Sequence, residues 1–152
     1  MRLAHLQIAE TALRELDGSR DVVWKRDATV DPAMRAAVSR FRRDWHLVAA
    51  THFQRVGAFA DALKFASAAI REFPDEAVFH VIAGSTFEAL GSAASFDNVR
   101  AFVGLSGDPD DNTQEALRQA TRAFERALVL TPGDSEARIR LARVHVLRGQ
   151  PD

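Results

Sequence analysis

Histidine is the first residue type in this sequence with chemical potential, because its imidazole binds metals and transfers protons near neutral pH. His46 and His52 are six residues apart, which places them on different faces of a helix, and the chain has no HExxH or similar ligand pair. Metal ligands on one helix must share a face. We therefore expect structural roles for the histidines and predict that the protein binds no metal and no other cofactor.

Other residue types with catalytic potential also lack a suitable context. The carboxylates show no fixed pairing, and we expect them to be solvated or to cap helices: Asp61, Glu88, Asp97 and Asp111. Ser85 and Ser92 do not follow a strand, as a nucleophile elbow requires. No GKS or GKT sequence forms a phosphate loop. The sequence therefore predicts a protein that is not an enzyme.

Arginines gather in two places that can receive an acidic peptide or a phosphate. One group is Arg35, Arg40, Arg42 and Arg43, and the other is Arg138, Arg140, Arg143 and Arg148. Acidic residues are interspersed, exposed aromatic stacking partners form no regular set, and the formal net charge is -1. We interpret both groups as solvated helix faces and predict no nucleic-acid partner.

Length and composition indicate a single cytoplasmic domain. The 152 residues suffice for a substantial core, and the absence of cysteine fits a reducing compartment. No apolar run approaches the roughly 20 residues of a membrane span. The start of the chain contains Glu10 and Glu15 and is a poor signal peptide. We expect no membrane contact.

A repeated spacing organises most of the chain. At an offset of thirty-four residues, Ala50, Phe53 and Gly57 correspond to Gly84, Phe87 and Gly91. At an offset of fifty-eight, Ala62, Ala66, Ala69 and Pro74 correspond to Ala120, Phe124, Ala127 and Pro132. The same offset carries Gly84 and Gly91 onto Ala142 and Gly149. The larger offset indicates an insertion inside the second unit.

Over about residues 43–152 the chain resembles the tetratricopeptide repeat family, whose unit is a pair of helices in about 34 residues. The residues that carry the resemblance are Ala49, Ala50, Phe53, Gly57, Ala62, Ala69 and Pro74. The sequence departs from the family where a tryptophan is usual, at His46, His80 and Arg138, and His145 occupies an aromatic position. The resemblance implies an all-α, right-handed helical array of about two and a half repeats, preceded by a leading helix.

The first part of this array occupies residues 1–74. Residues 1–30 are expected to form the leading helix and a linker, and residues 31–152 the repeat domain. Repeat one, residues 31–74, has an extended first helix that begins at Asp31-Pro32 and runs to about Val56. Gly57 ends this helix, and the second helix covers 58–73.

The remaining repeats are expected after Pro74. In repeat two, residues 75–132, Asp75 caps the first helix and Gly91 closes it. An insertion, residues 92–111, precedes a helix that a capping box of Asn112 and Glu115 opens. Residues 134–152 supply the first helix of an incomplete third repeat. Small residues are expected to let paired helices approach closely, with phenylalanines beside them.

The last helix has apolar residues on more than one face: Ile139, Leu141, Ala142, Val144, Val146 and Leu147. A terminal helix of a repeat array needs a polar outer face. We therefore expect either that the natural protein continues past Asp152 or that another copy of the chain covers this face.

The resemblance implies that first helices of successive repeats line a concave groove for a partner protein or peptide. The matching positions are Leu47, Thr51, Gln54, Arg55, Val81, Ser85, Glu88, Ile139, Arg143 and Val146. They lack the lysine and asparagine of a carboxylate clamp, which favours a partner helix or extended segment. Packing against neighbouring helices is the alternative role. The insertion is interpreted either as a lid or partner contact, or as a segment packed on the array.

The predicted function is a non-enzymatic protein-interaction module or scaffold. Two alternatives stay open: an accessory or regulatory domain of a larger enzyme or regulator, and a homodimerisation module that acts through the unfinished last helix.

Overall fold

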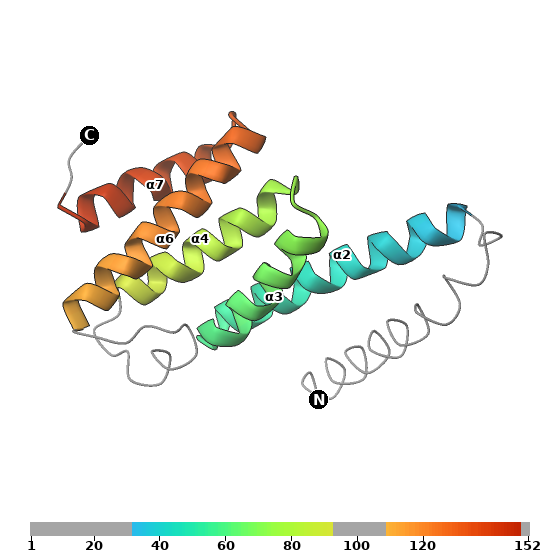
Figure 1. The fold of residues 1–152 in the computed structure, drawn as a ribbon, viewed down its shortest axis with the longest axis horizontal. Coiled ribbons are helices and arrows are strands. Elements are labelled where there is room, and N and C mark those ends of the chain that lie inside the picture. Colours follow the sequence, from blue (N-terminus) through green and yellow to red (C-terminus); the bar gives the residue numbers. More distant parts are fainter. Residues whose placement is uncertain (1–31, 93–108, 150–152) are drawn as a thin grey trace. The chain divides into compact units, whose positions relative to one another are not determined.

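The computed structural model describes residues 32–92 and 109–149, and within these ranges every regular element is an α-helix (Figure 1). This confirms the all-α prediction. The chain divides into two compact units, residues 1–45 and 46–152. The boundary falls inside the first described helix, directly after Trp45. The predicted leading helix and residues 93–108 of the predicted insertion lie outside the described residues.

Five helices make up the described part of the chain, and their ends lie close to the predicted ones. The helices are α2 (Pro32–Arg55), α3 (Phe59–Glu72), α4 (Ala77–Ser92), α6 (Pro109–Leu130) and α7 (Ser135–Leu147). Gly57 after α2 and Gly149 after α7 have φ values of 77° and 69°, which glycine adopts without strain. The Asp134 carboxylate accepts a hydrogen bond from the Ala137 N–H at 3.0 Å, which confirms the predicted cap.

The predicted capping box at the start of α6 is wrong. The helix begins at Pro109, so Asn112 lies inside it and is buried. Proline is favoured at the first position of a helix, where its missing N–H needs no partner. The Glu115 carboxylate accepts hydrogen bonds from Arg118 at 2.8 Å and Gln119 at 2.7 Å instead. These hydrogen bonds, led by the one from Arg118, lower the pKa of Glu115.

Both predicted ends of α4 are also shifted. The helix begins at Ala77, two residues after Asp75, and Asp75 instead pairs with Arg126 at 3.5 Å. Gly91 does not close the helix, because α4 continues to Ser92. A Cβ atom at Gly91 would lie 2.5 Å from Leu117 Cδ2. Gly91 therefore serves the close approach of α6 to α4.

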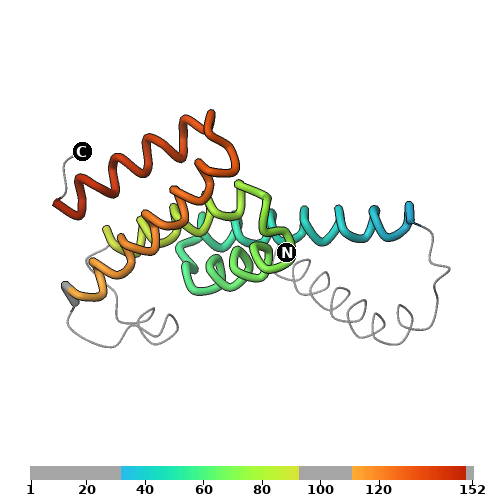
Figure 2. Tube along the Cα trace, turned by 45° about the horizontal axis from the view of Figure 1, so that its top comes forward, coloured from blue at the N-terminus to red at the C-terminus, as the bar shows by residue number. Residues whose placement is uncertain are grey.

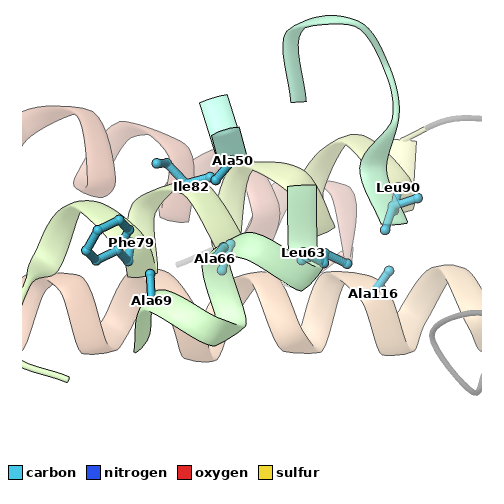
Figure 3. Close-up of a cluster of buried hydrophobic side chains, with 9 residues drawn as sticks. Ala50, Leu63, Ala66, Ala69, Phe79, Ile82, Leu90 and Ala116 are labelled. Atoms are coloured by element: carbon cyan, nitrogen blue, oxygen red, sulfur yellow. The ribbon is translucent and has the colours of Figure 1, made fainter. Parts of the chain in front are cut away.

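Among the described residues, the core consists of two clusters of buried apolar side chains. The first joins α2, α3, α4 and the start of α6 (Figure 3): Ala50, Leu63, Ala66, Ala69, Phe79, Ile82, Ala83, Leu90 and Ala116. The second joins α6 and α7: Leu117, Ala120, Phe124, Ala127, Ala137 and Val144. Phe87 on α4 packs against both clusters. Because α4 contacts α3, α6 and α7, it is the central helix of this unit.

Small residues allow the close approach between helices that the sequence predicts. Gly84 on α4 faces Phe124 on α6, and a Cβ atom at Gly84 would lie 2.8 Å from the Phe124 ring. Phe124 is fully buried. On the other side, the rings of Phe53 and Phe65 stack with their centroids 5.4 Å apart. Glycine and phenylalanine thus fit together where two helices meet.

The last helix keeps part of its apolar surface in water. α7 runs antiparallel to α6 from the turn that joins them (Figure 2). Val144 is fully buried against α6, whereas Ile139, Val146 and Leu147 are exposed. The prediction of apolar residues on more than one face of this helix is confirmed. Within residues 32–92 and 109–149, no helix has the length and apolar character needed to cross a membrane.

Substituting Gly84 by alanine tests the close approach of α4 and α6. Alanine raises helix propensity by about 1 kcal/mol, but overpacking a core costs about 1 to 3 kcal/mol. Because the Phe124 ring is fully buried and a Cβ atom would lie 2.8 Å from it, we expect the overpacking to dominate and the free energy of unfolding to fall by about 1 kcal/mol. Urea denaturation measures this change.

Gly133→Ala is the matched control for that substitution. Nothing lies within 4 Å of a Cβ atom at Gly133, and we expect a change within about 0.5 kcal/mol. A Gly84→Ala protein as stable as the Gly133→Ala protein would contradict the close contact.

The lowered pKa of Glu115 predicts a pH-dependent contribution to stability. A carboxyl group whose pKa is lower in the folded state stabilises the fold above its ordinary pKa of 4.5. We expect Glu115→Gln to lower the free energy of unfolding at pH 7 by about 0.5 kcal/mol. The difference should vanish as the pH falls through the lowered pKa. Denaturation of Glu125→Gln, an exposed position on the same helix, is the control, and a deficit that persists in acid would contradict the assignment.

Candidate functional site

The ten predicted partner-binding positions lie on α2, α4 and α7, and their exposure separates them into three groups. Ser85 and Glu88 are buried. Four positions are half-buried: Leu47, Thr51, Gln54 and Val81. Leu47 packs against the first core cluster, and Val81 packs against the second. The exposed positions, which are open to a partner, are Arg55, Ile139, Arg143 and Val146.

A hydrogen bond links α2 to α4 through two of these positions. The Gln54 side-chain amide donates to the Ser85 hydroxyl at 2.6 Å. The Ser85 hydroxyl lies in turn 2.9 Å from the Val81 carbonyl and 3.1 Å from the Ile82 carbonyl, to which it can donate. The buried hydroxyl therefore has partners on both sides and fixes Gln54 against α4.

An ion-pair cluster links α4 to α7. The Glu88 carboxylate is buried, and its two oxygens lie 3.0 Å from Arg140 and 3.2 Å from Arg143. Arg140 also pairs with Glu136 at 2.9 Å. Burial lowers the pKa of Arg140, but the hydrogen bonds to Glu136 and Glu88 outweigh this effect and raise it. The expectation that Glu88 is solvated or caps a helix is wrong, because two guanidinium groups from α7 compensate its buried charge.

These two contacts occupy corresponding places in the repeat. Glu88 follows Gln54 by thirty-four residues, and Arg143 follows Ser85 by fifty-eight. These are the same two offsets that relate the units of the sequence. The contact between α2 and α4 is therefore matched, residue for residue, by the contact between α4 and α7. Side-chain contacts thus connect α2, α4 and α7 in one row.

The exposed part of the predicted surface lies mainly on α7. Ile139 and Val146 are 70% and 73% exposed, and seven residues place them two turns apart on one face. Arg143 lies between them, with its side chain 66% exposed. This face combines apolar area with a guanidinium group. It is suited to contact an amphipathic segment that carries apolar and acidic side chains.

His46 and His80 make contacts within the described fold. His80 Nε2 lies 3.2 Å from the Pro74 carbonyl oxygen, and His46 Nε2 lies 3.7 Å from Glu72. The His46 ring also contacts Phe65, with the ring centroids 6.3 Å apart. Across the part of the chain that the structure describes, no three histidine or acidic side chains come together as a metal site.

The C-terminal arginine group is engaged within the chain. Arg138 donates to the Pro132 carbonyl at 2.7 Å, and Arg148 to the Thr121 hydroxyl at 3.3 Å. Arg140 is the important residue that the list of partner-binding positions missed, since it holds Glu88 from α7. Its spacing from Glu136, four residues on one helix, is the local signal that marks it as an ion-pair residue.

Fold and contacts together define an all-α protein in which three helices are joined in a row by equivalent contacts. No protein-family model, curated protein or solved structure matches the chain.

Removing the two arginines that hold Glu88 should destabilise the protein more than removing Glu88. Arg140→Ala with Arg143→Ala leaves a buried carboxylate without its counter-charges, and we expect a loss of about 3 to 5 kcal/mol. Glu88→Gln leaves two arginines that water can reach, and we expect a loss of about 1 to 2 kcal/mol. Urea denaturation at neutral pH gives both values.

The control for the double variant is Arg118→Ala with Arg126→Ala. These arginines belong to ion pairs on the surface, where each pair contributes no more than about 1 kcal/mol. Equal losses for the two double variants would show that the Glu88 cluster behaves as a surface ion pair, contrary to this prediction.

Proposed function

We propose that this protein is a non-enzymatic interaction module of the tetratricopeptide-repeat type, which binds a helix or extended segment of a partner protein along the row formed by α2, α4 and α7. The observation that carries the proposal is the repeated contact, in which Gln54 with Ser85 and Glu88 with Arg143 are related by the offsets of the sequence repeat. A row of equivalent helices offers one continuous surface to a chain that lies across it.

The pattern of small and large residues also supports this proposal. Ala50 and Gly84 lie at corresponding positions, and both are buried where their helix meets its neighbours. Ala62, Ala69, Ala120 and Ala127 are fully buried on the intervening helices α3 and α6. The pairs α2 with α3 and α4 with α6 then form two repeats, and α7 begins a third.

The exposed side chains indicate which residue types a partner segment needs. Ile139 supplies an apolar contact on α7, and Arg55 supplies positive charge on α2. Arg143 pairs with Glu88, but its side chain is 66% exposed and can also meet an acidic group. A segment with an apolar anchor and acidic residues complements these side chains. The buried Ser85 and Glu88 then serve to position the row. A cytoplasmic location is part of the proposal, and the absence of cysteine supports it.

Ile139→Asp tests the proposed surface, with Val129→Asp as a matched control. Ile139 on α7 and Val129 on α6 are 70% and 69% exposed, so neither substitution disturbs the core. Proteins captured from extract by the wild-type chain and by Val129→Asp, but lost with Ile139→Asp, are candidate partners. A labelled peptide from a candidate then gives affinities by fluorescence anisotropy.

We expect Ile139→Asp to weaken binding of that peptide at least about tenfold, which is about 1.4 kcal/mol. Val129→Asp should bind like the wild-type chain. Equal affinities for all three proteins would exclude α7 from the binding surface.

A further inference from the structure

The contacts between α2, α4 and α7 follow a register that defines which side chains face the next helix in the row. On α4, Ile82 and Ser85 face back towards α2: Ser85 bonds to Gln54, and Ile82 shares a core cluster with Ala50. On α7, the corresponding residues fifty-eight positions later, Arg140 and Arg143, face back towards Glu88. Ser85 on α4 and the corresponding Arg143 on α7 thus each contact the preceding helix of the row, and Ile82 and Arg140 lie three residues before them.

Extending this register identifies the side chains at the two ends of the row. On α2, thirty-four positions before Ile82 and Ser85, the residues are Val48 and Thr51. Val48 is 57% exposed. On α7, the residue that corresponds to Gln54 and Glu88 is Val146, which is 73% exposed. On α2 and α4 this position holds the polar residues Gln54 and Glu88, whereas on α7 it holds the apolar Val146.

The two exposed valines at the ends of the row can therefore meet: their positions in the register correspond, and both side chains are apolar. Val48 on α2 occupies the position through which α4 and α7 contact the helix before them in the row. Val146 on α7 occupies the position through which α2 and α4 contact the helix after them. Both carry exposed β-branched apolar side chains, which gain free energy when they are buried against each other. Polar residues of the kind found at Gln54 and Glu88 would suit water better. A second copy of the chain carries both surfaces, so its α2 can meet Val146 and its α7 can meet Val48.

We propose that copies of this chain associate head to tail, with Val146 on α7 of one copy packed against Val48 and Thr51 on α2 of the next. The new contact continues the register that joins α2 to α4 and α4 to α7. Such an interface is heterologous, because the two copies contribute different surfaces. A contact of this kind adds further copies beyond two, as a ring where the rotation between copies closes and as an open chain where it does not. The inference concerns the ends of the row and goes beyond the binding of a foreign segment along it.

The experiment measures mass by sedimentation velocity over a concentration series up to about 1 mM, which detects association of about -4 kcal/mol. The samples are the wild-type chain, Val48→Glu, Val146→Glu, an equimolar mixture of these two variants, and Val129→Glu as an exposed-valine control. We expect the wild-type and Val129→Glu masses to rise with concentration without a plateau at two copies. Val48→Glu alone and Val146→Glu alone should each stay at the monomer mass of 16.8 kDa.

The mixture of the two variants distinguishes a head-to-tail contact from a two-fold contact. Val48→Glu retains an intact Val146, and Val146→Glu retains an intact Val48, so together they should form a complex of one copy each with twice the monomer mass. A wild-type chain that stays monomeric overturns the proposal. Dimers of Val48→Glu alone indicate a two-fold contact between α7 helices and also overturn it, as does a mixture that stays monomeric. Far-UV circular dichroism verifies folding, and Val48→Thr with Val146→Thr, which keep the side-chain shape, replace any glutamate variant that does not fold.

Discussion

The contact between α4 and α6 at Gly84 is the constraint on which the rest of the described fold depends. The Phe124 ring occupies the space where any other residue at position 84 would place its side chain. Gly91 repeats this arrangement against Leu117 two turns later. Because α4 also contacts α3 and α7, its distance from α6 sets the positions of all three. Alanines fill much of the core and bury little apolar area each. The large buried side chains Phe79, Phe124, Leu90 and Leu117 therefore supply much of the hydrophobic stabilisation.

Polar contacts add specificity to this apolar packing. A helix packed through alanine and glycine can slide with little change in buried area, because its surface is smooth. Glu88 prevents such sliding, since any shift of α7 leaves a buried carboxylate without Arg140 and Arg143. The hydrogen bond between Gln54 and Ser85 restrains α2 against α4 in the same way at lower energetic cost. The strongest restraint acts at α7, the helix with the largest share of exposed apolar residues.

The features that the sequence predicts well are those with a local cause. Gly57, Gly149 and Asp134 mark helix ends through their own backbone or side-chain geometry, and their helices end or begin as expected. The start of α6 was predicted wrongly, because the capping pattern at Asn112 matched the sequence although Pro109 opens the helix three residues earlier.

The candidate site shows the same difference between features with a local cause and features that depend on distant residues. The repeat spacing selected residues on α2, α4 and α7, and two pairs of these residues meet. Their exposure did not follow from the pattern. Glu88 has no ion-pair signal nearby in the sequence, and its partner Arg140 is fifty-two residues away. Only the packing of α7 on α4 brings the two together, and a third helix, α6, contacts both.

The division of the chain after Trp45 has a spectroscopic consequence. Both tryptophans, Trp24 and Trp45, precede His46, and the chain contains no tyrosine. Intrinsic tryptophan fluorescence therefore originates from the unit of residues 1–45, whereas far-ultraviolet circular dichroism also records α3, α4, α6 and α7 of the other unit. Melting curves recorded by the two methods follow different parts of one molecule. If the curves separate, they report two units that unfold independently, each of which can still be fully cooperative.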